Sequence, residues 1–385
     1  MTYHNSKTYQ ICKSCVMDTS DKNIKFDQSG VCDYCQNYNS VIKPYLDDNI
    51  KNSEVYFDNL VKNLKRQHSK NKSEYDCLIG FSGGIDSSYL VYYVVQELKL
   101  NPLLFHVDTG WNNKIAISNI ENFIDKYDLD LHTEVIDWNE IRDIQLSFFK
   151  AQVPTVDAIQ DHAIWAATFK YAKENNFKYI FTGGNLHTEC IREPIYWHYH
   201  AGDLTQIHDI HNKFGNVKIN KFPTCDILSY QILYKYLYGI RIVQPLNYIN
   251  FSKQKAIDQL NKELDWKDYG GKHHESIFTK FVEGYWLPTK FGIDKRRVHY
   301  SSLIMSKEIT REEALDQISK PSYNHDELYK DFNYIALKLG IKYEELKNIY
   351  SGKNKYHYDY KSKDYLLVFI LKILRLLKSE KRIMR

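Results

Sequence analysis

The sequence lacks a long apolar run and lacks a strong excess of charge of either sign. No stretch approaches the about 18 successive apolar residues that a membrane-spanning helix needs. The polar start Met1–Asn5 does not resemble a signal peptide. The formal net charge of +4 over 385 residues is too small to indicate a nucleic-acid partner by itself. We therefore expect a globular cytoplasmic protein with room for two or three domains.

Cysteine is scarce, yet four of the seven cysteines form two closely spaced pairs. A CxxC spacing places two thiolates on one tight turn, where they can bind the same ion. Because cytoplasmic thiols stay reduced, metal binding is favoured over disulfides. We predict a structural Zn²⁺ site in a module of residues 1–45, with the ligands Cys12, Cys15, Cys32 and Cys35. An iron–sulfur cluster and unrelated free thiols are the alternatives.

The most informative stretch is the glycine- and serine-rich segment Ser82–Ser88 (SGGIDSS), which follows the apolar run Cys77–Phe81. This pattern predicts a strand, a tight turn and a helix whose first backbone N–H groups face the turn. Such a site suits a phosphate or pyrophosphate. The Gly-Lys-Ser/Thr ending of a Walker A loop is missing.

The segment resembles the SGGxDS loop of the PP-loop ATP pyrophosphatases. The resemblance implies that the loop holds the pyrophosphate of ATP while a substrate oxygen attacks the α-phosphate. Asp86 would then help to hold Mg²⁺. The phosphate contacts would come from the loop residues Ser82, Gly83, Gly84, Ser87 and Ser88.

Strand and helix patterns alternate on both sides of the loop's helix. The expected strands are Cys77–Phe81, Pro102–Asp108, His132–Ile136, Tyr179–Thr182 and Ile240–Gln244, and the expected helices are Tyr89–Leu98, Ile115–Tyr127, Ala158–Asn175 and Tyr230–Tyr238. The alternation predicts an α/β fold, a parallel sheet with helices on both faces, over residues 76–250. A helical connector of residues 46–75 precedes it, and a helical region of residues 251–385 follows.

Ligands gather beyond the carboxyl ends of parallel strands, where we expect three loops to face one crevice. Besides Ser82–Ser88, these are the loop after Asp108, which could contact the ribose or the adenine, and the loop Gly183, Gly184 and Asn185. Glu189 could hold Mg²⁺ or an incoming amine. Asp157, Asp161 and His162 are candidate substrate or metal contacts, although helix capping also explains residues of these types.

Later segments add basic, histidine-rich and amphipathic patterns. Lys272, Lys295 and Arg296 suit an anion such as a departing pyrophosphate or a sugar carboxylate, although a solvated surface is the alternative. The histidines His198, His200, His208 and His211 favour a wall around a polar substrate over a metal site. Thr310–Glu313 predicts a capping box. The apolar, basic tail is expected to pack on the protein itself, on a partner or on a membrane surface.

Taken together, these motifs resemble one family, the N-acetyl sugar amidotransferases of surface-polysaccharide and flagellin-sugar biosynthesis. The resemblance covers roughly residues 10–320 and rests on the cysteine pairs, SGGIDSS, Gln160–Ala163, Thr182–Asn185, Lys272–Ser276 and Phe291–Arg296. It implies that ATP adenylates the acetamido oxygen of a bacterial sugar and that ammonia then displaces AMP to give an acetamidino sugar. A separate glutaminase with an ammonia channel would be the partner, because we find no glutaminase motif.

Two other functions stay open, and so do several details. A tRNA-thiolating PP-loop enzyme has a similar layout, but its loop is often SGGKDS and it uses cysteines near the nucleotide, for which Cys190 is the candidate here. The other is a non-enzymatic scaffold with a degenerate nucleotide domain. The sequence does not specify the sugar, which could be acidic or nucleotide-linked, or the general base, for which His162 and His187 are candidates.

Overall fold

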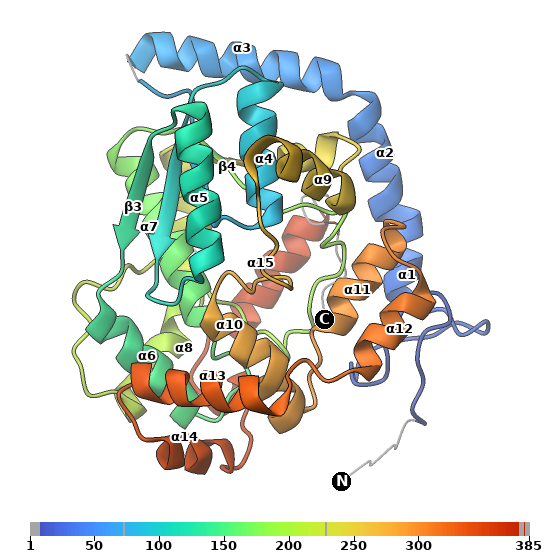
Figure 1. Cartoon of the computed structure of the whole chain (residues 1–385), viewed down its shortest axis with the longest axis vertical. Coiled ribbons are helices and arrows are strands. Elements are labelled where there is room, and N and C mark those ends of the chain that lie inside the picture. Colours follow the sequence, from blue (N-terminus) through green and yellow to red (C-terminus); the bar gives the residue numbers. More distant parts are fainter. Residues whose placement is uncertain (1–7, 72–73, 228, 377–380, 382–385) are drawn as a thin grey trace.

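The computed structural model (Figure 1) describes residues 8–71, 74–227, 229–376 and 381. Its centre is a parallel sheet of five strands in the order β3-β2-β1-β4-β5. The strands are β1 (Cys77–Gly80), β2 (Pro102–Asp108), β3 (Leu131–Val135), β4 (Tyr179–Phe181) and β5 (Arg241–Val243). The α/β fold expected from the sequence is thus confirmed, and each expected strand is present with its ends shifted by at most one residue.

The central strands are apolar because both faces of the sheet are covered. In β1, Leu78 packs into one hydrophobic cluster and its neighbour Ile79 into the other. One cluster is completed by α3 (Ser53–Asn71), α4 (Ile85–Gln96), α5 (Lys114–Tyr127) and α9 (Lys253–Leu264). The opposite cluster contains α6 (Trp138–Lys150) and α7 (Ala158–Glu174). Strands buried on both faces read as continuous apolar runs rather than alternating ones.

The same cluster as α6 and α7 also takes in the cysteine module and the C-terminal helices. In Figure 1, α3 lies at one end of the molecule and α13 and α14 lie at the other. The remaining helical segments are α1 (Asp33–Asn37), η1 (Tyr38–Ile42), α2 (Lys43–Lys51), α8 (Leu204–Phe214), η2 (Ser229–Leu237), η3 (Pro245–Tyr248), α10 (Ile277–Phe281), η4 (Val282–Phe291), α11 (Arg296–Met305), α12 (Arg311–Ser319), α13 (His325–Lys338), α14 (Tyr343–Tyr350), η5 (His357–Asp359) and α15 (Asp364–Leu376).

Helices α6 and α8 were not expected, although both carry a recognisable start signal. The side chain of Asp137 accepts hydrogen bonds from the backbone N–H groups at the start of α6, and Asp203 does the same for α8. The capping box expected at Thr310 is confirmed, since its hydroxyl accepts from the N–H of Glu313 and the Glu313 carboxylate accepts from the N–H of Thr310.

The last helix, α15, has one side on the protein and one side in solvent. Val368 and Lys372 line a cavity described below, while Tyr365 and Phe369 are 79% and 60% exposed. None of the helices in the described ranges combines the length and the apolar content that crossing a bilayer demands. The basic residues Lys378, Arg382 and Arg385 of the tail lie outside the described residues.

Candidate active site

The SGGIDSS loop lies at the point where the strand order reverses. The chain passes from β1 to β2 on one side and returns to β4 on the other, so the carboxyl ends of β1 and β4 flank a crevice. Gly83 has a φ of +77°, and a Cβ there would stand 2.4 Å from the carbonyl oxygen of Ala116. Only glycine fits this turn, which directs the loop into the start of α4.

Hydrogen bonds within the loop hold it in shape. The Ser82 hydroxyl accepts from the N–H of Gly84 at 3.2 Å and lies 3.2 Å from the Ser87 hydroxyl. Ser88 is fully buried, and its hydroxyl has no hydrogen-bond partner among the described residues. The loop therefore presents preset hydroxyl and N–H groups beside the N-terminus of α4, where an anion is stabilised.

The loop after β4 packs directly on the start of α4. A Cβ on Gly183 would lie 2.7 Å from the carbonyl carbon of Asp86 and 2.7 Å from the N atom of Ser87. Asn185 stands behind this contact, because its side-chain oxygen accepts from the N–H groups of His187 at 3.0 Å and Thr188 at 2.9 Å. Asn185 is 3% exposed and shapes the loop without lining the crevice.

Asp108, at the end of β2, also has a structural task. Its Oδ1 accepts from the N–H of Gly110 at 2.7 Å and from the side chain of Asn112 at 3.1 Å. The crevice is lined next to it by Thr109 and Asn112 instead. Asp108 thus holds the second strand-end loop in place at the edge of the site.

The crevice itself, which we call the inner chamber, has a volume of about 480 Å³. It collects residues from all three predicted loops, from the start of α7 and from the segments around Lys272 and Lys295. The predicted site residues that line it are Ser82, Gly84, Asp86, Ser87, Asp157, Asp161, Gly183, Gly184, Glu189, Lys272 and Lys295. The sequence motifs therefore converge on one cavity although they span more than half of the chain.

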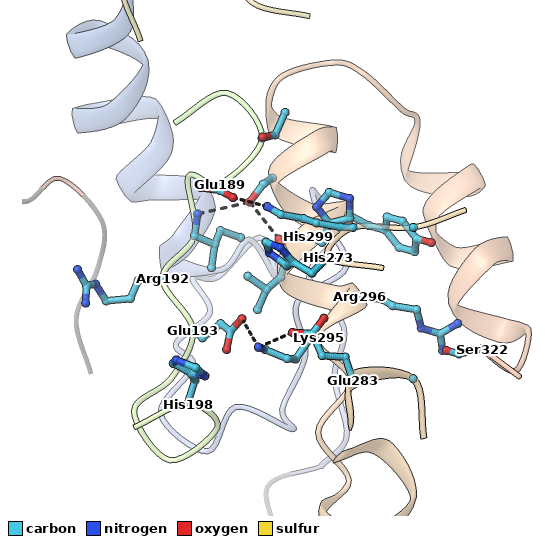
Figure 2. A pocket seen from close by; sticks show the side chains of 18 of the residues that line it. Glu189, Arg192, Glu193, His198, His273, Glu283, Lys295, Arg296, His299 and Ser322 are labelled. Carbon is cyan, nitrogen blue, oxygen red and sulfur yellow. Dashed lines mark hydrogen bonds and ion pairs between the residues drawn. The ribbon is translucent and has the colours of Figure 1, made fainter. Parts of the chain in front are cut away.

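A second cavity of about 1210 Å³, the outer chamber, adjoins the inner one (Figure 2). The two share a wall that the side chains of Glu189, Glu193, His198, Lys272, His273, Glu283, Lys295 and His299 form. Beyond this wall, Arg192, His200, Lys320 and three residues of α15 line the outer chamber. The two chambers therefore adjoin each other at these side chains.

Two partly buried lysines neutralise the carboxylates of the shared wall. Lys272 Nζ lies 2.7 Å from Glu189, and Lys295 Nζ lies 2.7 Å from Glu283 and 3.1 Å from Glu193 (Figure 2). Burial alone would lower the pKa of Lys295, but Glu193 and Glu283 outweigh it and raise that pKa above its ordinary value. Both lysines are therefore fixed cations at the junction.

Asp86 faces the inner chamber with an unsatisfied oxygen. Its Oδ1 is buried and has no hydrogen-bond partner in the described part of the chain. Burial raises the pKa of Asp86 to about 6, against the opposing effect of the Lys272 cation. Asp86 and Glu189 together offer the carboxylate oxygens that Mg²⁺ prefers, so the donor set fits that ion.

Two predicted site residues serve the framework instead. His162 is 3% exposed, with Nδ1 2.6 Å from the carbonyl oxygen of Ala201 and Nε2 accepting from the N–H of Cys225 at 3.3 Å. Arg296 donates from Nε, Nη1 and Nη2 to Asp294 and to the carbonyl oxygens at the end of α12. The nitrogens of both side chains are thus hydrogen-bonded within the protein, although Arg296 also lines the outer chamber.

The two cysteine pairs of the N-terminal module lie close together in the structure. The Sγ atoms of Cys12, Cys15, Cys32 and Cys35 lie within 4.8 Å of one another, with closest pairs at 3.6–3.8 Å. Tetrahedral zinc with bonds of about 2.3 Å requires sulfur atoms about 3.8 Å apart. All four thiols are buried, so the geometry fits one ion with no open coordination position. A four-iron cluster would need the sulfur atoms much further apart.

Sequence reasoning missed Glu193, His273, Glu283 and His299 as members of the site. The signal was present for His299, which stands four residues after Lys295 and so shares its face of α11. Likewise, His273 follows Lys272 directly. Glu193 and Glu283 carry no motif, and only the fold brings them to the shared wall.

His273 predicts a pH dependence of stability. Burial alone would lower the pKa of His273, but the Glu275 carboxylate 3.8 Å away outweighs it and raises that pKa to about 9. Because the folded-state pKa is raised above 6.5, the stabilisation is complete below pH 6.5 and is lost as pH rises through 9. His273→Gln should therefore lower the melting temperature at the acidic end only. Because the His273 side chain is half exposed, the substitution should lower the free energy of unfolding by about 1 kcal/mol. This loss corresponds to a decrease in melting temperature of roughly 2–4 °C.

Thermal unfolding of both proteins between pH 6.5 and 9 measures this difference. His325→Gln is the matched control, since His325 also lies beside a carboxylate, that of Asp326, but both side chains are more than 90% exposed. A His273→Gln effect that stays constant over the whole pH range would contradict the prediction.

Comparison with known proteins agrees with the sequence motifs. Residues 275–375 match the family model described as "LPS biosynthesis protein WbpG-like, C-terminal domain". An uncharacterised protein of Methanocaldococcus jannaschii is 26% identical over 336 residues, which cover 85% of this chain and 99% of the relative. The matched segment 275–375 contributes Glu283, Lys295 and His299 to the shared wall.

Solved structures with distant likeness include two synthetases and a thiolase. NMN synthetase from Francisella tularensis is 14% identical with a TM-score of 0.28, and the match covers 58% of this chain and 94% of that chain. The U34-tRNA thiolase NcsA from Methanococcus maripaludis with its 4Fe-4S cluster is 14% identical with a TM-score of 0.32, over 79% of this chain and 90% of that chain. NH3-dependent NAD synthetase from Campylobacter jejuni is 14% identical with a TM-score of 0.27, over 56% of this chain and 88% of that chain. The family match, by contrast, confirms the resemblance seen in the motifs: residues 275–375 are similar to the WbpG-like C-terminal domain of LPS biosynthesis proteins.

Proposed function

We propose that the protein is an ATP-dependent amidotransferase that converts the acetamido group of a bacterial sugar into an acetamidino group. The observation that carries the proposal is the pair of adjoining chambers, one built on the SGGIDSS loop and the other on the WbpG-like segment. A reaction that joins a nucleotide to a sugar needs two adjoining sites of this kind. The description of the matching family as LPS biosynthesis proteins supports a sugar as the second substrate.

The inner chamber would hold ATP with its phosphates over the SGGIDSS loop. The N-terminus of α4 and the hydroxyls of Ser82 and Ser87 would bind the phosphate oxygens. Mg²⁺ held by Asp86 and Glu189 would neutralise charge on the phosphates. Lys272 and Lys295, both cationic at the junction, would stabilise the negative charge that develops as pyrophosphate leaves.

The outer chamber would take the sugar, with its acetamido oxygen pointing through the shared wall at the α-phosphate. Attack by this oxygen forms the adenylated intermediate, in which AMP has become a good leaving group. Histidine and arginine side chains such as His198 and Arg192 offer polar contacts to a sugar. Ammonia would come from a separate glutaminase partner, which is also a proposal.

The test is a product assay with the purified protein, ATP, Mg²⁺, ammonium and a panel of acetamido sugars that includes UDP-N-acetylglucosamine and N-acetylneuraminate. Mass spectrometry should find one sugar lighter by the difference between O and NH, with AMP and pyrophosphate released in equal amounts. Absence of sugar-dependent AMP across the panel would overturn the proposal.

A tRNA arm in the same assay tests the thiolation alternative. No cysteine lines either chamber among the described residues. Cys190, the candidate named from the sequence, is 2% exposed, and its Sγ lies 3.4 Å from the sulfur of Met305. AMP formation that requires tRNA and a sulfur donor would favour thiolation, and the Cys190→Ala variant would then be tested.

A further inference from the structure

His299 occupies a distinctive place in the site. It projects from α11 and lines both the inner and the outer chamber (Figure 2). A side chain in this position adjoins the point where a ligand of one chamber meets a ligand of the other. In the reaction proposed above, this is the point where the sugar carbon, AMP and ammonia come together.

The ring of His299 has no hydrogen bond within the described part of the chain, and its Nδ1 is shielded from solvent. The two other histidines that line both chambers are engaged. His198 lies 3.6 Å from Asp161, and His273 lies 3.8 Å from Glu275. Among the described histidines of the shared wall, only His299 has a buried ring nitrogen without a hydrogen-bond partner.

The surroundings of His299 keep the ring neutral. Burial, together with the positive charges of Lys272, Lys253 and His273, holds the pKa of His299 well below its ordinary value. Lys272 is itself paired with Glu189 at 2.7 Å, so this carboxylate is already neutralised. A neutral imidazole can accept a proton, whereas an imidazolium cannot.

We infer that His299 is the base that takes the proton from ammonia as it attacks the adenylated acetamido carbon, an assignment that rests on the proposed function. The nitrogen lone pair of NH₃ forms a C–N bond and gives a tetrahedral centre that bears a C–NH₃⁺ group. His299 accepts one proton from this group. The C–O bond to AMP then breaks, the oxygen leaves with AMP, and the electron pair on nitrogen forms the C=N bond of the amidinium.

On this assignment, His299 acts as the base without a carboxylate paired to its ring. A lone imidazole returns its proton readily to solvent or to the departing AMP, because the three cations around it favour the neutral form. The surrounding cations also repel ammonium, so that the nucleophile reaches the carbon as neutral ammonia. Proton removal by a positioned base of this kind accelerates a step by about 10²–10⁴-fold.

The variant His299→Gln separates the two half-reactions. Sugar-dependent exchange of labelled pyrophosphate into ATP, which reports adenylation, should stay within a few-fold of the unsubstituted protein. Amidine formation with ammonium should fall by about 10²–10⁴-fold. The adenylate should then react with water, so that AMP is released without amidine.

Two further measurements exclude a merely structural role. Hydroxylamine, whose conjugate acid loses its proton far more easily than ammonium, should restore much of the C–N bond formation in His299→Gln. The matched control is His187→Gln, because His187 also has a buried nitrogen without a partner and a pKa lowered by burial, but lines neither chamber. It should leave both half-reactions unchanged.

The outcomes distinguish this inference from the proposed function. If the unsubstituted protein amidinates a panel sugar and His299→Gln does so equally well, the assignment of His299 is overturned and the proposed function stands. If the unsubstituted protein releases no AMP with any sugar of the panel, both fall.

Discussion

Gly183→Ala should remove most of the ATP-dependent activity and destabilise the fold. The added Cβ would stand 2.7 Å from backbone atoms of Asp86 and Ser87, which belong to the first turn of α4. Backbone atoms cannot move aside as a side-chain end can, so the loop after β4 must shift away from the SGGIDSS loop. Overpacking of this kind costs about 1–3 kcal/mol, and a shift of about 1 Å at a reacting centre can reduce the rate about 10²-fold.

The adjacent glycine supplies the control. A Cβ on Gly184 would meet one close atom, the side-chain Nε2 of Gln244 at 3.0 Å, and would make ordinary contacts with the side chains of Glu189 at 3.7 Å and Thr182 at 3.8 Å. All three are side-chain atoms that can move aside. Thermal unfolding and sugar-dependent AMP release should therefore show a much smaller effect for Gly184→Ala than for Gly183→Ala. Equal effects of the two variants would mean that the contact between the β4 loop and α4 does not organise the nucleotide site.

The strands and the SGGIDSS loop could be predicted because their signals are local. A strand buried on both faces is a short apolar run, and β2 is such a run from Pro102 to Asp108. The loop is a glycine turn between two such apolar segments. The cysteine pairs are equally local, since each pair needs only its own turn to aim two thiolates at one point.

The limits of sequence reasoning are visible in neighbouring residues. On α7, Asp161 lines the inner chamber, whereas His162 points away and bonds to backbone groups. Successive residues of a helix are rotated by about 100°, so two adjacent side chains point in different directions and make different contacts. At the start of α11, Lys295 lines both chambers, whereas Arg296 lines only the outer one and binds Asp294. A motif in the sequence identifies the segment, and helix phase decides which of its residues reach the ligand.

The histidine wall expected from the sequence supplies His198 and His200 to the outer chamber, but the chamber as a whole could not be predicted, because segments far apart in the chain build it. The loop after β4 supplies Glu193 and His200, η4 supplies Glu283, and α15 supplies Val368. No local sequence pattern in one of these segments indicates that it packs against the others. The 1210 Å³ cavity follows only from how α11, α12 and α15 pack against the β4 loop.

Removal of the metal should affect this outer chamber although the cysteines lie outside it. Arg297 on α11 binds Asp18 at 3.1 Å and the carbonyl oxygen of Val16 at 2.8 Å, both in the cysteine module. Arg311 donates to the carbonyl oxygen of Cys12 at 2.9 Å. Helix α11 also carries His299. The module thus positions the helix that forms one wall of the chamber.

Cys32→Ser should therefore lose bound metal, stability and activity together. A module this small has too little core to fold without its ion, so about 3–5 kcal/mol of stabilisation should be lost, which lowers the melting temperature on the order of 10 °C.

Cys225→Ser is the matched control, because Cys225 is also buried but is not part of the cluster. Metal analysis should find one zinc per chain in the control and little in Cys32→Ser. Because the module reaches the chamber through Arg297, activity should decline in step with metal content during chelation, before global unfolding. Iron with sulfide in place of zinc, or full activity in a metal-free protein, would contradict this account.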